Sequence, residues 1–189
     1  MGDPEDHLHL LELLGEGAYG AVYRAERRDN HEEVAVKIIP VDSNAENFCN
    51  EVDIMLGCTS PYTMGLHDCY LKARGLRIAQ QLLRSALQDN EIWLVMEYAG
   101  GGSVSDIMEA CGATLSEEET KECVVWMALA LEYLHSNRKL HRDVKAGNVL
   151  LTLDGKAKLA DFGVSKEINS MATGAQTAIG TPYWMAPEV

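Results

Sequence analysis

Apolar and polar positions alternate in short runs through the first forty residues, and these runs predict strands. Residues 8–14 are mostly apolar, the string 15–20 holds three glycines, and side chains alternate again over 21–26. A period of two on both sides of a glycine-rich break is typical of a β-hairpin. Residues 34–39 form a β-branched run that ends at Pro40, which predicts a third strand.

Two segments carry helical spacing behind a capping signal. Ser43 and Glu46 have the S-x-x-E spacing of a capping box, so we expect a helix over 43–56, and Ser116 with Glu119 repeats that signal later in the chain. The second helix is apolar on its other sides as well, which predicts that it is buried. The first helix would bury Phe48, Val52 and Met55, and the second Cys123, Met127, Ala130 and Leu134.

Two further strands, over 66–71 and 92–98, would complete a five-stranded sheet with one helix. The glycines at 100–102 then predict a linker between two lobes, with one domain over 1–99 and a second, mainly helical one over 100–189. Within the second domain, Asp154-Gly155 predicts a two-residue hairpin turn between strands at 149–153 and 157–159. The fold class is therefore α+β.

The stretch 72–90 differs from its surroundings. Four basic residues and one acid give it a charge of +3 in a chain of net charge −13. Leu76, Ala79, Leu83 and Ala86 share a helical face there. We interpret the stretch either as an inserted docking helix or as translated intron sequence.

Composition narrows the class of protein. Acidic residues outnumber basic ones by 29 to 16, which argues against broad affinity for nucleic acid or anionic lipid. The longest apolar run, 123–131, is far shorter than the roughly 20 residues that a membrane span needs. Five cysteines without a C-x-x-C pair indicate reduced thiols and a cytoplasmic protein, and residues 1–6 carry no secretory or lipid signal.

The glycine string is ambiguous alone. Gly15-x-Gly17-x-x-Gly20 fits either a dinucleotide-binding turn that opens a helix or a hairpin that covers phosphates, and the strand-like alternation after it favours the hairpin. Lys37 lies in the third predicted strand and Glu51 in the first predicted helix. Taken singly, each is as readily an ordinary solvent-exposed residue.

Three motifs in order change that interpretation. His141-Arg142-Asp143-Val144-Lys145-Ala146-Gly147-Asn148 resembles the catalytic loop of eukaryotic protein kinases; Asp161-Phe162-Gly163 and Ala186-Pro187-Glu188 follow at the family's spacing. Together with the strings 101–107 and 180–189, they resemble the sterile-twenty group of serine/threonine kinases, especially germinal-centre and Hippo-type kinases. The resemblance runs from Leu8 to Val189 apart from 72–90, and implies a bilobal kinase fold.

The resemblance implies transfer of the γ-phosphoryl group of ATP to serine or threonine hydroxyls of protein substrates, within a signalling cascade. Asp143 would orient the hydroxyl and accept its proton, and Lys145 would neutralise charge on the transferred group. Thr181 would line the pocket beside the acceptor. Lys37 would hold the α and β phosphates with Glu51 as its partner.

Cofactor roles follow from the same resemblance. Asn148 and Asp161 would hold Mg²⁺, because hard cations prefer oxygen ligands. Main-chain groups of Glu97 and Ala99 would bind adenine, Met96 would be the gatekeeper, and Ser103 would touch the ribose. The residues expected around ATP are Leu14, Gly15, Glu16, Gly17, Ala18, Tyr19, Gly20, Val22, Ala35, Lys37, Met96, Glu97, Ala99 and Ser103.

Regulation is implied as well. Arg142 directly before Asp143 is typical of kinases that are activated by phosphorylation. Thr177 is the leading candidate for the modified residue, through an upstream kinase or trans-autophosphorylation, and Thr173 and Ser170 are weaker ones. The family's stacked regulatory spine would comprise His141, Phe162, Met55 and Leu66.

The end of the chain departs from the family pattern. Protein kinases continue past Ala-Pro-Glu with several helices, so we expect this sequence to be a fragment, itself inactive alone, of an active kinase. Glu188 would then lack its buried arginine partner, and the helix after Ser116 would expose an apolar face. The alternative is a catalytically incompetent, pseudokinase-like or truncated binding module, although Lys37, Asp143 and Asp161 are all intact.

Overall fold

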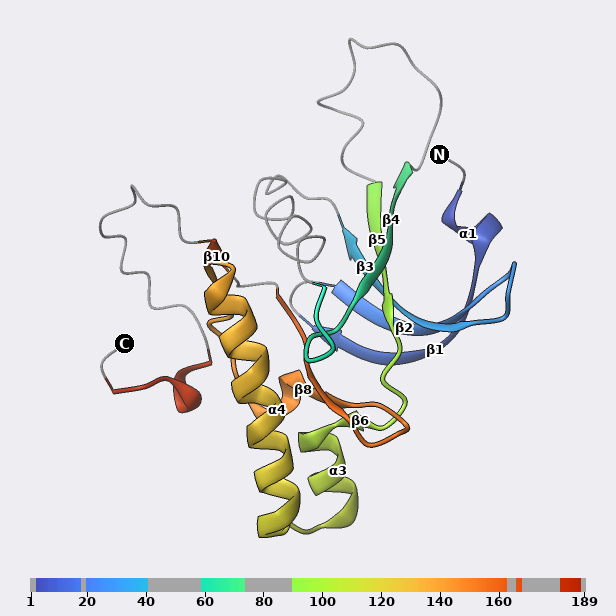
Figure 1. The fold of residues 1–189 in the computed structure, drawn as a ribbon. Helices are drawn as coiled ribbons and strands as arrows, with labels where there is room; N and C mark the ends of the chain where they lie inside the picture. Colours follow the sequence, from blue (N-terminus) through green and yellow to red (C-terminus); the bar gives the residue numbers. More distant parts are fainter. Residues whose placement is uncertain are drawn as a thin grey trace. The chain divides into compact units, whose positions relative to one another are not determined.

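The structure, a computed structural model, describes residues 3–17, 20–40, 59–73, 90–162, 166–167 and 181–187. The chain divides into two compact units (Figure 1). The first comprises Met1–Phe48 and Leu66–Tyr98, and the second Cys49–Gly65 and Ala99–Val189. The helix predicted over 43–56 lies outside the described residues.

The first unit is built on a five-stranded antiparallel sheet, which confirms the prediction. The strands are β1 (Leu8–Gly17), β2 (Gly20–Arg27), β3 (Glu33–Pro40), β4 (Leu66–Ala73) and β5 (Asn90–Glu97), in the spatial order β1-β2-β3-β5-β4. Gly17 pairs with Gly20, so the glycine string forms the predicted hairpin tip between β1 and β2. The sheet is coloured from blue to green in Figure 1.

One face of this sheet carries the hydrophobic core of the unit. The core consists of Leu8, Ala25, Val34, Val36, Trp93 and Val95, with Leu10, Ile38 and Tyr70 packed against it. Successive side chains of a strand point to opposite faces, and paired residues share a face. Because Val36 pairs with Tyr23 and Val95, the apolar residues of β2, β3 and β5 fall together. The intervening residues of β3, Ala35 and Lys37, therefore belong to the opposite face.

A short helix at the start of the chain, α1 (Pro4–His7), packs on this unit and was not predicted. Asp3 caps it by accepting a hydrogen bond from Glu5 N at 3.1 Å, and Pro4 occupies the first turn, where a missing N–H costs nothing. The His7 ring stacks on Tyr70 with centroids 5.7 Å apart. Asp3-Pro4 was the available signal, but four residues are too few for any periodicity.

Strands β4 and β5 are longer than predicted. Both continue into the stretch 72–90, since Lys72 pairs with Glu91 and Ala73 with Asn90. The Lys72 ammonium forms an ion pair with Glu5 and lies 5.0 Å from the centre of the Trp93 ring. Lys72, Ala73 and Asn90 of the predicted insertion therefore belong to the sheet, and residues 74–89 lie outside the described residues.

The second unit contains two capped helices. In α4 (Glu117–Ser136), Ser116 and Glu119 form the predicted capping box, with Glu119 N donating to Ser116 Oγ at 3.2 Å and Ser116 N donating to Glu119 Oε2 at 2.8 Å. Helix α3 (Val104–Cys111) was not predicted, although Ser103 and Asp106 form a similar box and Gly112 ends it at φ +61°. An aspartate in place of the usual Glu or Gln hid this signal.

One side of α4 is less buried than expected. Met127, Ala130 and Leu134 are buried and Cys123 is half-buried, as predicted. Val124 and Val125, however, are 59% and 48% exposed, so not every face of this helix is buried, and the expectation that it exposes an apolar face is confirmed. No helix of the described residues is long and apolar enough to cross a membrane.

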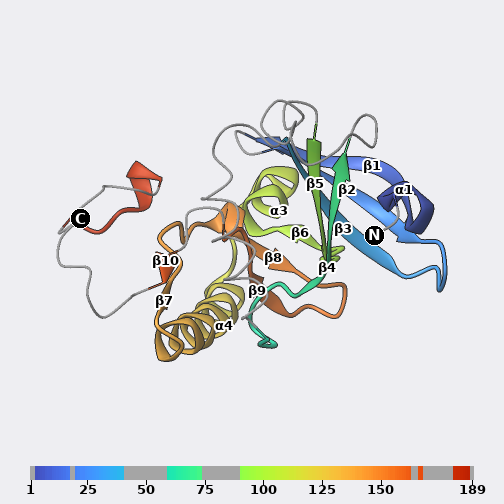
Figure 2. The same cartoon turned by 90° about the horizontal axis from the view of Figure 1, so that it is seen from above.

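Short strands complete the second unit. The sheet order is β6 (Gly102–Ser103), β8 (Val149–Leu151) and β9 (Ala157–Leu159), and β7 (Lys139–Leu140) pairs with β10 (Lys166–Glu167), as Figure 2 shows from above. Two single-turn 3₁₀ helices, η2 (Ala146–Asn148) and η3 (Pro182–Trp184), lie in the motif-bearing loops.

The predicted two-residue turn between β8 and β9 was wrong in detail. Gly155 N donates to Thr152 O at 2.9 Å, so Leu153 and Asp154 are the central residues of the turn. Gly155 follows at φ +81°, the left-handed position of a three-residue hairpin loop. Thr152 stabilises this longer loop, because its hydroxyl donates to Asp154 Oδ1 at 2.5 Å and accepts from Lys156 N at 3.1 Å.

The segment 59–65 docks on α4 and β9 within the second unit. Thr63 forms a bridge with Leu159, and Met64 N donates to Leu159 O at 2.9 Å. The Tyr62 ring meets the Trp126 ring edge-on at 5.3 Å. These contacts hold the segment against the strand that leads into Asp161.

Candidate active site

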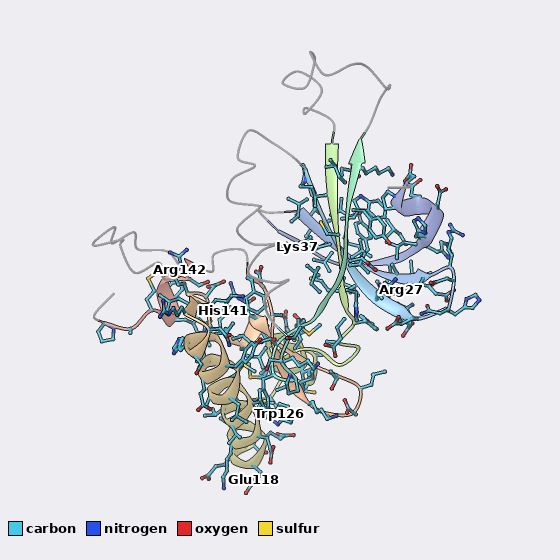
Figure 3. All side chains as sticks on the ribbon, turned by 45° about the horizontal axis from the view of Figure 1, so that its top comes forward. Arg27, Lys37, Glu118, Trp126, His141 and Arg142 are labelled. Carbon is cyan, nitrogen blue, oxygen red and sulfur yellow. The ribbon has the colours of Figure 1, made fainter. Side chains whose placement is uncertain are left out.

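The catalytic-loop string, residues 141–148, follows β7 directly and ends with η2, near the C-terminal end of α4. Figure 3 shows His141 and Arg142 at that end of the helix and Glu118 at the other. His141 is buried and its ring meets Phe162 edge-on at 5.3 Å, so two of the four predicted spine residues are in contact. Leu66 lies half-buried on β4, and Met55 is outside the described residues.

Hydrogen bonds fix the tautomer of His141. Its Nε2 lies 2.9 Å from the carbonyl oxygen of Ala160, which can only accept, so Nε2 carries the proton. Asp143 N donates to Nδ1 at 3.3 Å. Burial lowers the pKa of His141 below the ordinary imidazole value. The neutral ring of His141 therefore connects Ala160, the residue before Asp161, to the main chain of Asp143.

The Asp143 carboxylate accepts hydrogen bonds on both oxygens. Oδ1 accepts from Thr181 Oγ1 at 2.5 Å and from Thr181 N at 3.1 Å. Oδ2 accepts from Lys145 Nζ at 2.8 Å and from Asn148 Nδ2 at 3.0 Å. Burial alone would raise the pKa of Asp143, but these hydrogen bonds outweigh it and hold that pKa below its ordinary value. Asp143 is therefore ionised at neutral pH.

Lys145 bridges the two segments of the site. Its ammonium donates to Asp143 Oδ2 at 2.8 Å and to Thr181 Oγ1 at 3.0 Å. The Thr181 hydroxyl consequently accepts from Lys145 and donates to Asp143 in one closed triangle. Only a hydroxyl can do both at once, which explains why Ser or Thr suits this position. The sequence indicated that Thr181 lies near the substrate hydroxyl, but not that Thr181 forms hydrogen bonds with Asp143.

The two residues expected to hold a metal ion are brought close by the β8–β9 hairpin. Ala160 N donates to Asn148 O at 2.9 Å. Asp161 follows Ala160 in the chain, so this backbone hydrogen bond brings Asp161 close to Asn148. Asn148 also donates from Nδ2 to Asp143 O at 2.7 Å, which leaves its side-chain oxygen available as a ligand. No group of three or more His, Cys, Asp or Glu side chains gathers in the described part of the chain. An ion here would complete its shell with phosphate or water oxygens.

Backbone strain marks this site. Arg142 and Asp161 have φ of +68° and +64°, two of the four non-glycine residues with positive φ in the described ranges. Such conformations cost about 1–3 kcal/mol each and occur mainly at functional sites. Burial lowers the pKa of the Arg142 guanidinium, because desolvation disfavours its charged form. The candidate phosphorylation residues Thr177, Thr173 and Ser170 lie outside the described residues.

In the first unit, strand register brings several predicted nucleotide residues to one face. Val22 pairs with Lys37, and Ala35 with Met96, so these four share the face opposite the hydrophobic core. Lys37 is labelled on the sheet in Figure 3. Its predicted partner Glu51 lies outside the described residues. Leu14 has no partner in the ladder, because β1 bulges there, and it is half exposed.

The glycines of the hairpin tip have two different environments. A Cβ on Gly20 would lie 2.1 Å from Ile38 O, and its φ is +126°, so the backbone itself requires glycine there. A Cβ on Gly15 or Gly17 would meet nothing within 4 Å. Those two glycines leave open space along the backbone, which fits close approach by a phosphate group. Glu16 is exposed on the same strand, and Ala18 and Tyr19 are outside the described residues.

The linker residues also have definite environments. Glu97 is the last residue of β5. Gly102 N donates to Ala99 O at 3.1 Å and closes a turn over residues 99–102, and this hydrogen bond does not involve the N–H of Ala99. Ser103 is buried, and its hydroxyl lies 2.6 Å from Asp106 Oδ2 and 2.9 Å from Ser105 Oγ. That hydroxyl already caps α3.

Comparison with known families agrees with this geometry. The family model described as the protein kinase domain matches residues 8–189. The match includes the five-stranded antiparallel sheet and the strained loop that carries Asp143. The chain belongs to the protein kinase domain family, whose members act as phosphotransferases on protein substrates.

Proposed function

We propose that this kinase is a serine/threonine kinase of the sterile-twenty group that transfers the γ-phosphoryl group of ATP to protein hydroxyls. The observation that carries the proposal is the closed triangle of Asp143, Lys145 and Thr181. A lysine two residues after the catalytic aspartate is the serine/threonine pattern. The strings 101–107 and 180–189 support the subgroup.

The carboxylate geometry suits the acceptor step. Asp143 is ionised and partly buried, and it can orient a substrate hydroxyl and accept its proton. The hydroxyl oxygen forms a bond to the γ-phosphorus, the bond from that phosphorus to the β,γ-bridging oxygen breaks, and ADP leaves. In this step Thr181 Oγ1 gives way to the substrate hydroxyl or shares Oδ1 with it.

The remaining residues supply charge and position. Lys145 would lie beside the transferred group and stabilise its charge in the transition state. Lys37 would bind the α and β phosphates with support from Glu51. Asn148 and Asp161 would hold Mg²⁺, which neutralises phosphate charge and orients the phosphates when it is bound.

Adenine and ribose contacts follow the same scheme. Val22, Ala35 and Met96 share the sheet face that would cover the base, with Leu14 at the bulge of β1. The main-chain groups of Glu97 and Ala99 would bind the adenine edge, and Ser103 lies at the start of the segment expected near the ribose. Gly15 and Gly17 leave room for the phosphates.

The decisive experiment compares Asp143→Asn with the unsubstituted protein, each expressed with a completed C-terminal lobe. Transfer of radioactive phosphate from ATP to a generic basic protein should fall by at least about a hundredfold, because the amide cannot accept the proton. Nucleotide binding measured by calorimetry should remain within about threefold. Phosphoamino-acid analysis should return phosphoserine and phosphothreonine only, and phosphotyrosine would overturn the assigned specificity.

The same assay separates the proposed kinase from a non-catalytic binding module. An unsubstituted protein that binds ATP but transfers no phosphate, with or without prior treatment by an upstream kinase, would favour the binding module. Mass spectrometry after ATP incubation would locate any phosphate at Thr177, which we propose as the activating site because Arg142 lies next to Asp143.

A further inference from the structure

The chain that follows Ala99 turns back and docks on the β8–β9 hairpin. Gly102 N donates to Ala99 O at 3.1 Å and closes the turn, and Gly101 N donates to Leu151 O at 2.8 Å. The ladder continues from there, with Gly102 opposite Leu151 and Ser103 opposite Leu150. The end of the linker is therefore an added strand of the sheet that leads to Asn148.

The three consecutive glycines of this turn have three different surroundings. A Cβ on Gly101 would lie 2.7 Å from Leu151 O, a backbone atom that cannot move away by rotation of a side chain. A Cβ on Gly100 would meet only the side chain of Leu153, at 3.0 Å, and that side chain is 83% exposed and free to turn. Gly102 has open space but needs glycine for its φ of +77°.

The docked turn also fixes Ala99. Ala99 is buried in a small cluster with Met64 and Ala160, and Leu150 of β8 packs against that cluster. Leu150 lies on β8 directly before Leu151, and that strand begins at the residue after Asn148. Displacement of Gly101 from Leu151 would move Ala99 and loosen the turn that holds its carbonyl oxygen.

We propose that Gly101 is a positioning residue for nucleotide binding, acting through its close backbone contact with Leu151. The inference rests on the proposed function, because it assumes that the main chain of Ala99 binds adenine. A methyl group at residue 101 would lie 2.7 Å from Leu151 O, so the two backbones would separate by about 0.3 Å to reach 3.0 Å and by about 0.7 Å to reach the 3.4 Å of ordinary contact. Loss of one hydrogen bond of ordinary net strength lowers affinity by up to about tenfold, so a loss of that size is expected when the main chain of Ala99 is displaced.

The first experiment measures steady-state kinetics of Gly101→Ala. KM for ATP should rise about tenfold, and kcat should stay within about twofold, because Asp143, Lys145 and Thr181 keep their hydrogen bonds. Calorimetry with a nonhydrolysable ATP analogue should show the same loss of affinity. Unchanged KM and unchanged affinity in the folded variant would overturn the inference.

Gly100→Ala is the matched control, with the same added methyl group one residue earlier. Its KM for ATP should stay within about twofold, and Leu153→Ala should remove any residual effect. Leu151→Ala should not rescue Gly101→Ala, because the clashing carbonyl oxygen remains. Rescue by Leu151→Ala, or an equal effect of Gly100→Ala, would show that side-chain crowding and not backbone docking matters.

A second measurement needs no variant. If docking of Gly101 and nucleotide binding are coupled, the nucleotide must stabilise docking by the same factor. Hydrogen exchange at the Gly101 amide should therefore be slow in the free protein and slow further, about tenfold, with saturating analogue. Fast exchange of the Gly101 amide in the free protein, or exchange that bound analogue does not slow, would overturn this inference and leave the proposed function standing. Failure of the unsubstituted protein to bind any nucleotide would instead overturn the proposed function, and this inference with it.

Discussion

The backbone N–H of Thr59 donates a hydrogen bond to the phenolic oxygen of Tyr133 at 2.9 Å, across 74 residues of sequence. Tyr133 lies on α4 one turn from its end, and Thr59 opens the segment that docks on β9. With the Tyr62–Trp126 ring contact, this bond ties the chain before β4 to the helix beside the catalytic loop. The tie uses side chains that show no motif in the sequence.

Tyr133→Phe tests this tie. The variant keeps the ring and removes only the acceptor oxygen, so the free energy of unfolding should fall by about 1 kcal/mol, the usual net value of one hydrogen bond. Urea denaturation followed by circular dichroism measures the change. Tyr183→Phe is the matched control, since Tyr183 is 93% exposed, and it should change stability by less than about 0.3 kcal/mol. Equal effects of the two substitutions would contradict the prediction.

The hairpin glycines should separate stability from nucleotide binding. Gly20→Ala should lower the free energy of unfolding by at least about 2 kcal/mol, because its Cβ would collide with Ile38 O and its φ is +126°. Gly17→Ala should leave stability unchanged or slightly higher, since nothing lies within 4 Å, and yet weaken ATP binding. Thermal melts and calorimetry report the two effects. A stable Gly20→Ala variant would show that β2 and β3 can separate there.

Thr181→Ala should change the pH dependence of phosphate transfer. Hydrogen bonds to a carboxylate favour its charged form, so loss of the Thr181 hydroxyl raises the pKa of Asp143. The acidic limb of the kcat profile should shift to higher pH, and kcat at neutral pH should fall about tenfold through lost positioning. Thr181→Ser retains the hydroxyl and should retain both properties. An unshifted acidic limb in Thr181→Ala would remove Thr181 from control of Asp143.

Stability should fall in mild acid because of His141. Burial lowers the pKa of His141 from its unfolded value of 6.5, so the unfolded chain binds the proton first. The free energy of unfolding should be flat with respect to this group above pH about 6.5 and decrease below it, down to the lowered pKa of the folded state. His141→Gln, which cannot titrate, should flatten that slope, and exposed His135→Gln should not. An unchanged slope in His141→Gln would assign the acid sensitivity to other groups.

Sequence patterns predicted the elements whose cause is local. The hairpin strands follow from alternation around the glycines and the third strand from a β-branched run, and the start of α4 follows from Ser116 and Glu119, because a capping box acts over three residues. Helix α3 was missed because Asp106 stands where Glu or Gln is usual. The loop at 152–156 was misjudged because the Thr152 hydroxyl, rather than glycine alone, shapes it.

The site was predictable only in part. Motif spacing identified Asp143, Asn148 and Asp161 individually, and strand register then placed Lys37 with Ala35 and Met96 on one face. The hydrogen bond from Thr181 to the Asp143 carboxylate joins residues 38 positions apart, so it depends on tertiary structure. The same is true of the Gly101 contact with Leu151, since the sequence does not distinguish three consecutive glycines whose surroundings differ in the folded chain.

The pairing of Ala73 with Asn90 has a practical consequence for the gene and for protein engineering. Their main chains pair in the ladder, so strand pairing reaches both ends of the sequence 74–89, and closure entropy grows only slowly with the length of sequence that joins two paired strands. An exon boundary at this point could gain or lose coding sequence without a change of strand register. Replacement of 74–89 by Asn-Gly, the dipeptide of tight hairpins, should leave the melting temperature within a few degrees. The same position would accept a fluorescent or affinity tag.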